Sequence, residues 1–136
     1  MSAGLANPTY VLTAARNADH PAERLKISVT APSEQVTLCA LAGEVDHYTA
    51  EVFRRRLIGS LGTAAPLVVI DLSKVTFFGV AGLYVLVDAR TMLTQTGRGL
   101  RLVTGAWCVD RLLQLAQDLG RFETRSSLAD AVLDAA

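Results

Sequence analysis

Hydrophobic side chains occupy every second position from residue 25 to residue 30, with polar side chains between them. This period of two predicts a half-buried strand. A polar turn over residues 31–34 separates it from a second apolar stretch over residues 36–42, so the two strands are expected to pair as a hairpin. Residues 43–46 break the pattern and are expected to end the second strand.

Three longer segments repeat hydrophobic residues every three or four positions, which is the spacing of a helix with one buried face. Asp46 or Thr49 is expected to cap the first helix, because either side chain can accept a hydrogen bond from a first-turn amide. The second helix is expected to stop at Gly97 and the third at Gly120, since glycine readily takes the conformation that ends a helix. The predicted buried positions are Ala50, Phe53, Leu57 and Leu61 in the first helix, Gly82, Val85, Leu86, Ala89, Met92 and Leu93 in the second, and Val109, Leu112, Leu113, Ala116 and Leu119 in the third.

Two short apolar runs lie between these helices. Residues 67–70 are hydrophobic on both faces and predict a central strand, which Asp71–Ser73 is expected to end. Residues 100–103 predict the next strand, and a strand, a helix and a strand in this order imply parallel neighbours joined by a right-handed crossover. Asp71 would then lie where α/β sheets often place ligands, although a turn-forming role is the simpler interpretation.

The C-terminal part of the chain predicts two further short elements. Residues 122–124 are expected to form an edge strand. Ser127, with Asp130 three positions later, resembles a capping box for a last helix that runs through Leu133. Because strands and helices alternate along the chain, the pattern as a whole indicates the α/β fold class.

The N-terminal part differs from the rest. Residues 1–24 carry small and polar side chains without sustained periodicity and are expected to form a flexible tail. Within it, Tyr10–Leu12 is a candidate for an extra strand at a sheet edge. Residues 25–136 are expected to form one domain, because a chain of 136 residues fits a single domain.

Charge and hydropathy exclude several classes of partner. The chain has 13 basic and 13 acidic side chains and a formal net charge of zero, whereas a nucleic-acid-binding protein normally has a basic surplus. No apolar run reaches the ~20 residues of a membrane span, and no signal peptide is evident at the N-terminus. We therefore expect a cytoplasmic protein that binds neither nucleic acid nor membrane.

The two cysteines, Cys39 and Cys108, lie far apart in the sequence. The simplest interpretation is that both are small packed hydrophobic residues with free thiols. Two alternatives remain open, a redox disulfide between them and a zinc site that they would form with His20 and His47. No short ligand spacing such as C-x2-C supports the zinc site, and no metal is expected.

Residue patterns that carry catalysis are missing from the sequence. It contains no G-x-S-x-G, no H-E-x-x-H and no glycine-rich phosphate loop ending in Lys-Ser or Lys-Thr. His47 beside Asp46 is a candidate base with an orienting carboxylate, but no nucleophile accompanies it. We therefore expect no catalytic residue, no cofactor and no enzymatic activity.

Several segments together resemble the STAS domain family. Residues 43–51 read GEVDHYTAE and are similar to the family's G-E-[LV]-D-x-x-[ST]-A stretch. Residues 68–78 resemble the strand and loop that lead into its D-S-[SA]-G-L switch, and residues 97–103 and 109–115 resemble its later strand and helix. The resemblance implies a STAS fold, with a mixed four- to five-stranded β-sheet packed with about four α-helices.

The resemblance also implies a function in bacterial signalling, that of an anti-sigma factor antagonist. Such a protein binds an anti-sigma factor, typically also a serine kinase, and so releases a sigma factor for transcription. It would act in the cytoplasm as a monomer or weak homodimer. The residues expected to contact the partner are Glu44, Asp46, His47, Tyr48, Thr49, Phe78 and Tyr84.

The sequence departs from the family pattern at the switch itself. Gly79 and Val80 stand where the family has aspartate and the phosphorylated serine, whereas Ala81 and Gly82 match. Valine has no hydroxyl, so this position cannot be phosphorylated. Tyr84, where many relatives have glycine, is expected to lie exposed beside the switch.

Two alternatives follow from this departure. Ser73 or Thr76 would be a substitute phosphorylation site close to the turn, although both are also ordinary turn-forming residues. In the second alternative, the chain is a non-switching STAS scaffold or a sensor subunit of a larger signalling complex.

Overall fold

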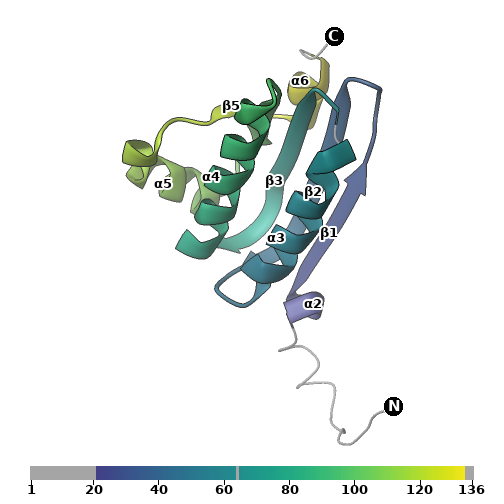
Figure 1. Ribbon diagram of the computed structural model, residues 1–136. Coiled ribbons are helices and arrows are strands. Elements are labelled where there is room, and N and C mark those ends of the chain that lie inside the picture. Colours follow the sequence, from purple (N-terminus) through teal and green to yellow (C-terminus); the bar gives the residue numbers. More distant parts are fainter. Residues whose placement is uncertain (1–20, 64, 134–136) are drawn as a thin grey trace, which may run out of the picture.

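A computed structural model describes residues 21–63 and 65–133. Five strands form one sheet in the order β1-β2-β3-β4-β5 (Figure 1). β1 pairs with β2 antiparallel, and β2, β3, β4 and β5 are parallel to their neighbours. The predicted hairpin, parallel pairing and mixed sheet are confirmed. The strands are β1 (Leu25–Thr30), β2 (Val36–Val45), β3 (Leu67–Phe78), β4 (Gly99–Val103) and β5 (Glu123–Arg125).

Helices cover the two faces of the sheet unequally. α3 and α4 lie side by side on one face, and α6 lies at the top of the sheet in Figure 1. The helices are α2 (Pro21–Arg24), α3 (Thr49–Ser60), α4 (Val80–Gln95), α5 (Trp107–Leu115) and α6 (Leu128–Leu133), with single 3-10 turns η1 (Leu61–Thr63) and η2 (Gln117–Leu119). No helix among residues 21–63 and 65–133 combines the length and the hydropathy needed to cross a bilayer.

The main hydrophobic core lies between the sheet and helices α3, α4 and α5. Its largest fully buried side chains include Phe53, Leu57, Ile70, Leu86 and Leu93, so most of the predicted helix faces are confirmed. In α4 the prediction was wrong at two positions, because Met92 is exposed whereas Leu83 is buried. Burial of Leu83 widens the apolar side of α4, so this helix packs against neighbouring elements as well as against the sheet.

A smaller core lies on the opposite face of the sheet, where Ala131 of α6 packs with valines of three strands. Arg101 of β4 joins the elements around it. Its Nη1 donates to the Ala131 carbonyl (2.7 Å), and its Nε lies 3.1 Å from Glu123 Oε1 in an ion pair. Hydrogen bonding to Arg101 lowers the pKa of Glu123. A buried guanidinium therefore connects β4, β5 and α6.

Two strands are longer than the sequence predicts. β2 continues to Val45 instead of ending at residue 42, and β3 continues through Asp71–Ser73 to Phe78. Asp71 Oδ1 accepts from the Ser73 amide (3.0 Å) and hydroxyl (2.7 Å), which bends the strand without ending it. The register of β2 against β3 shifts at two irregularities and pairing then resumes. Asp71 is thus a mid-strand residue and does not lie at a strand end, where α/β sheets often place ligands.

The C-terminal elements differ from expectation by small amounts. The third helix ends at Leu115 and a 3-10 turn follows it, so Leu119 is exposed and not on a continuous buried face. Gly120, expected to end the third helix, instead ends this 3-10 turn, with φ +99°. The edge strand covers residues 123–125, one position later than expected. The Asp130 amide donates to Ser127 Oγ (3.1 Å), which confirms the predicted cap of the last helix.

The described part of the chain begins with a short helix. Residues 21–24, placed in the expected tail, form α2, whereas the candidate strand at Tyr10–Leu12 lies outside the described residues. Gly43 of β2 lies opposite the end of α2. It has φ +115°, and a Cβ added to it would lie 2.2 Å from the Arg24 carbonyl oxygen. The approach of α2 to β2 therefore requires glycine at this position.

Both cysteines are free thiols. Cys39 is buried in the main core, and this burial raises the pKa of its thiol to about 12. A thiol in that state is a poor nucleophile, which does not suit a redox role. Among the described residues no group of histidine, cysteine and acidic side chains could hold a metal ion. His20, the fourth residue of the zinc alternative, lies outside them.

Candidate functional site

The ends of β2 and β3 bring two predicted segments together. Val45 pairs with Phe78, and the Gly79 amide donates to the Val45 carbonyl (2.9 Å). The loop after β2 and the turn after β3 therefore leave the sheet side by side, and they lead into the neighbouring helices α3 and α4 (Figure 1). Residues some thirty positions apart in the sequence thus form one site.

The loop after β2 is held by reciprocal hydrogen bonds. Asp46 Oδ1 accepts from the amides of Tyr48 and Thr49 (both 2.9 Å), and the Asp46 amide donates to Thr49 Oγ1 (2.8 Å). The Thr49 hydroxyl also donates to the Glu44 carbonyl (2.8 Å). Both predicted capping residues take part, and the arrangement has the reciprocity of a capping box. His47 and Tyr48 are exposed at the tip of this rigid loop.

Arg24 of α2 holds the same loop from outside. Its Nη1 donates to Glu44 Oε1 (3.1 Å) and to Asp46 Oδ2. Burial alone would raise the pKa of Asp46. The Thr49 amide, the Arg24 guanidinium and the Tyr48 amide outweigh that effect and lower this pKa to about 2. Both carboxylate oxygens of Asp46 therefore accept hydrogen bonds that hold this loop.

The lowered pKa predicts how the stability of the domain depends on pH. Because the pKa of Asp46 is about 2 in the folded chain against an ordinary value of 3.8, ionised Asp46 stabilises the fold above its unfolded-state pKa. This contribution is expected to be lost as the pH falls through that value toward about 2. Urea unfolding over this range should show Asp46→Asn with a weaker acid dependence than the wild-type chain.

A matched variant separates this effect from general acid sensitivity. Glu34 lies exposed in the β1–β2 turn, and its side chain makes no hydrogen bond or ion pair with the described residues. Glu34→Gln should therefore keep the acid dependence of the wild type. Identical acid profiles for Asp46→Asn and the wild type would contradict the assignment.

The turn after β3 depends on close packing at Gly82. A Cβ added to this residue would lie 2.6 Å from Val45 Cγ1 and 2.9 Å from the Phe78 ring. Glycine therefore lets the first turn of α4 rest directly on the ends of β2 and β3. Gly79, at the cap position, has an extended backbone and no side chain to cap the helix. The turn keeps its shape without the polar cap that the family motif would supply.

Large apolar side chains are exposed around this site. Tyr48, Phe77, Val80 and Tyr84 are 67%, 52%, 53% and 53% exposed. We call these four residues the docking surface. Beside them, a groove of about 220 Å³ runs between α3 and α4 and is lined by His47 from the first loop and by Ala81 and Tyr84 from the second segment. Arg54, also in the groove, bonds to Asp88 across the two helices (2.6 Å).

The structure assigns different roles to the predicted contact residues. Thr49 and Phe78 are buried, so they support the site and offer no surface to a partner. Phe77, which the sequence reasoning missed, is exposed in place of Phe78. Adjacent strand residues point to opposite faces of the sheet, so Phe77 points away from the core that buries Phe78. This alternation was not predicted because the strand was expected to end before residue 77.

The two candidate phosphorylation sites remain predictions. Ser73 and Thr76 are both exposed on β3. Ser73 donates to Asp71, and Thr76 Oγ1 donates to the Gly43 carbonyl (3.2 Å). Each hydroxyl therefore has a structural partner that it would lose on phosphorylation.

Comparison with known sequences decides the family. The STAS domain profile matches residues 29–131, which is most of the chain. The chain belongs to the STAS domain family. The five-stranded mixed sheet of this STAS domain, with its helices, agrees with the fold expected from the resemblance. No curated protein matches the STAS chain in sequence.

Solved structures extend the comparison. The STAS domain is similar to an anti-sigma factor antagonist from Mycobacterium paratuberculosis, with 26% identity and a TM-score of 0.66 over 82% of this chain and 93% of that one. It is also similar to the phosphorylated form of SpoIIAA, a Bacillus cell fate determinant, with 12% identity and a TM-score of 0.65 over 82% of this chain and 100% of that one.

A third similar structure comes from a much longer protein. The murine anion transporter Slc26a9 matches with 21% identity and a TM-score of 0.62 over 74% of this chain, but over only 18% of the transporter. At this identity the likeness shows the fold alone. The STAS fold thus occurs both as a small separate chain and as a part of a large one.

Proposed function

We propose that this STAS domain is an anti-sigma factor antagonist-like regulator that binds an anti-sigma factor or switch-type serine kinase. In this proposal the partner contacts the docking surface, and the chain acts in the bacterial cytoplasm on the availability of a sigma factor. The supporting observation is the convergence of both family segments on one exposed apolar surface beside the α3–α4 groove. The likeness to an anti-sigma factor antagonist at 26% identity supports the same choice.

The docking surface has the composition of a protein-binding hot spot. Tyr48 and Tyr84 are amphipathic rings, and aromatic anchors carry much of the binding energy at protein interfaces. The capping box at Asp46 and the Arg24 contacts hold Tyr48 in place before a partner arrives. A preorganised loop loses little conformational freedom on binding, so more of the contact energy contributes to affinity.

Residue 80 makes the proposed regulator different from a phosphorylation switch. Val80 is half exposed at the first position of α4, and its side chain carries no group that a kinase can modify. Phosphorylation would place nearly two negative charges on a surface that must lose water on binding. Because this cannot happen at Val80, we propose that the docking surface stays competent for binding whenever the domain is folded.

A binding survey tests the proposal. The purified chain is titrated by calorimetry against each anti-sigma factor and switch-type kinase of its host, and one of them is expected to bind. Tyr84→Ala should then weaken binding by about tenfold or more, because it removes an interface anchor. Thr91→Ala, an exposed position further along α4, should leave binding unchanged. Failure of every candidate to bind the folded chain would reject the proposal.

A second experiment tests the loss of the switch. Incubation with the cognate kinase and ATP should leave residue 80 of the wild-type chain without phosphate, as measured by phosphopeptide mass spectrometry. The double variant Gly79→Asp, Val80→Ser restores the family residues and is expected to gain one phosphate at residue 80. Phosphate at Ser73 or Thr76 of the wild type, together with loss of binding, would instead show that phosphorylation of β3 regulates binding.

A further inference from the structure

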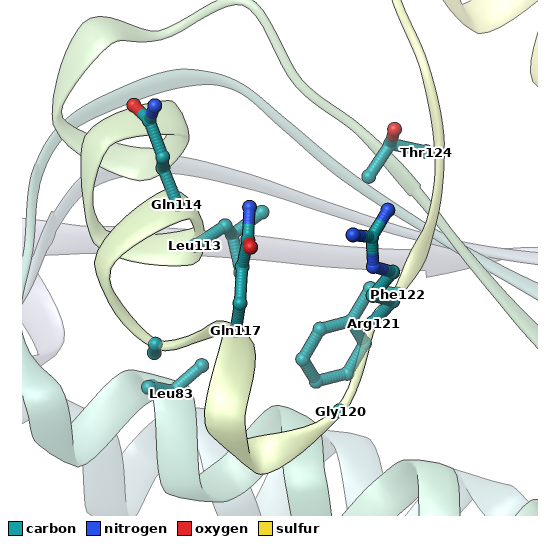
Figure 2. Close-up of a pocket in the computed structure, with 9 residues that line it drawn as sticks. Leu83, Leu113, Gln114, Gln117, Gly120, Arg121, Phe122 and Thr124 are labelled. Carbon is teal, nitrogen blue, oxygen red and sulfur yellow. The ribbon is translucent and has the colours of Figure 1, made fainter.

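A pocket lies on the side of α4 that faces away from α3. It is formed by α4, the end of α5 with η2, and the segment that leads into β5 (Figure 2). Its volume is about 190 Å³. Leu83 of α4 is buried at its wall, and Leu113, Ala116 and Phe122 add half-buried apolar surface. Part of the pocket lining is therefore apolar, and three separate elements supply this part.

Arg90 holds the wall of this pocket in place. Its guanidinium donates to the carbonyls of Leu119 (2.6 Å) and Arg121 (3.3 Å), and it stacks over the Phe122 ring with 4.3 Å between Cζ and the ring centroid. At Gly120 the backbone turns with φ +99°, and an added Cβ would lie 3.0 Å from the same guanidinium. These contacts hold the segment that forms one wall of the pocket.

Four exposed polar side chains surround the pocket. Those of Gln114, Gln117, Arg121 and Thr124 make no hydrogen bond or ion pair with the described part of the chain. Figure 2 shows the Gln117 amide and the Arg121 guanidinium projecting into the same space. No acidic residue lines the pocket, and the nearby Glu123 carboxylate is paired with Arg101 and Arg125. Among the described residues that line the pocket, Arg121 is therefore the one charged side chain.

We propose that this pocket binds a small organic carboxylate whose apolar body is about the size of one ring. An apolar cavity of about 150 Å³ in another protein holds benzene, so about 190 Å³ suits a ring with one substituent. Arg121 supplies a planar pair of donors that matches a carboxylate. The ring packs on Leu83, Leu113 and Phe122, and the glutamine amides contact the polar edge of the ligand.

Benzoate is the probe that tests this site. The ¹⁵N-labelled full chain is titrated with benzoate at constant ionic strength, and saturable amide shifts are expected in residues 113–124 and at Leu83. Benzamide has the same shape without the charge and should bind about tenfold more weakly. No saturable shifts with benzoate, or shifts confined to other surfaces, would overturn the site. Equal binding of benzoate and benzamide would overturn the assignment to carboxylates.

A pair of arginine variants completes the test. Arg121→Gln is expected to weaken benzoate binding by about tenfold and to leave benzamide binding unchanged, because only the ionic contact is lost. Arg111→Gln removes an exposed arginine of α5 that does not line the pocket, and it should leave both ligands unaffected. Equal losses in the two variants would indicate a general charge effect and contradict a site at Arg121.

Discussion

Replacing Gly43 with alanine is expected to lower the free energy of unfolding by about 3 kcal/mol, from backbone strain and a steric clash together. Its φ of +115° is a conformation that side chains disfavour, and the new Cβ would lie 2.2 Å from a backbone oxygen of Arg24. Backbone cannot move aside as a flexible side chain can. Relief of the clash requires α2 to move away from β2. This movement would also weaken the contacts of Arg24 with Glu44 and Asp46 in the loop after β2. Urea unfolding measures the loss.

Gly59 provides a matched control for this substitution. It lies within α3, and an added Cβ would meet nothing within 4 Å. Gly59→Ala is therefore expected to stabilise the domain by about 0.5–1 kcal/mol, the usual gain for alanine over glycine in a helix. If Gly43→Ala lowered the free energy of unfolding no more than Gly59→Ala does, α2 could not lie as close to β2 as described.

Replacing Val80 with glutamate is expected to weaken partner binding by about a hundredfold, equivalent to about 2.7 kcal/mol. The substitution places an unpaired negative charge on the docking surface at an exposed position, where binding would remove its water. The fold should tolerate the change, because Val80 is half exposed and an acidic residue in the first turn favours a helix. Titration against the partner found in the survey measures the loss.

The control for this variant changes the same charge elsewhere on α4. Gln95 is exposed at the last position of the helix, away from the docking surface. Gln95→Glu should bind the partner like the wild type. If Val80→Glu also bound like the wild type, the partner would have to contact a surface that does not include residue 80.

Much of the fold could be predicted from local patterns. The periods of two and of three to four residues gave the element types, since each element buries one side. Element ends were harder to place. The sequence Asp71-Leu72-Ser73 has the residues of a turn, but the buried Val75 and Phe78 let β3 continue after its bend. Pairing with a neighbouring strand decided this, and pairing is not a local property.

Only the local features of the candidate site could be predicted from the sequence. The capping roles of Asp46 and Thr49 are local, so they could be read from the sequence, as could the exposure of Tyr84. The contact between Arg24 and Asp46 joins residues from separate elements, and no local sequence pattern predicts it. The pocket beside Arg121 was missed because it forms only where α4, α5 and the β5 segment meet.

The position of α2 has a practical consequence for anyone who attaches a label or tether to this domain. Arg24 fixes α2 to the loop that carries Tyr48, whereas α6 lies at the other end of the sheet (Figure 1). A fluorophore or affinity tag joined just before α2 would emerge next to the docking surface and compete with a partner for space. The same group joined after α6 would leave that surface open, so immobilised binding assays should anchor the chain from its C-terminal side.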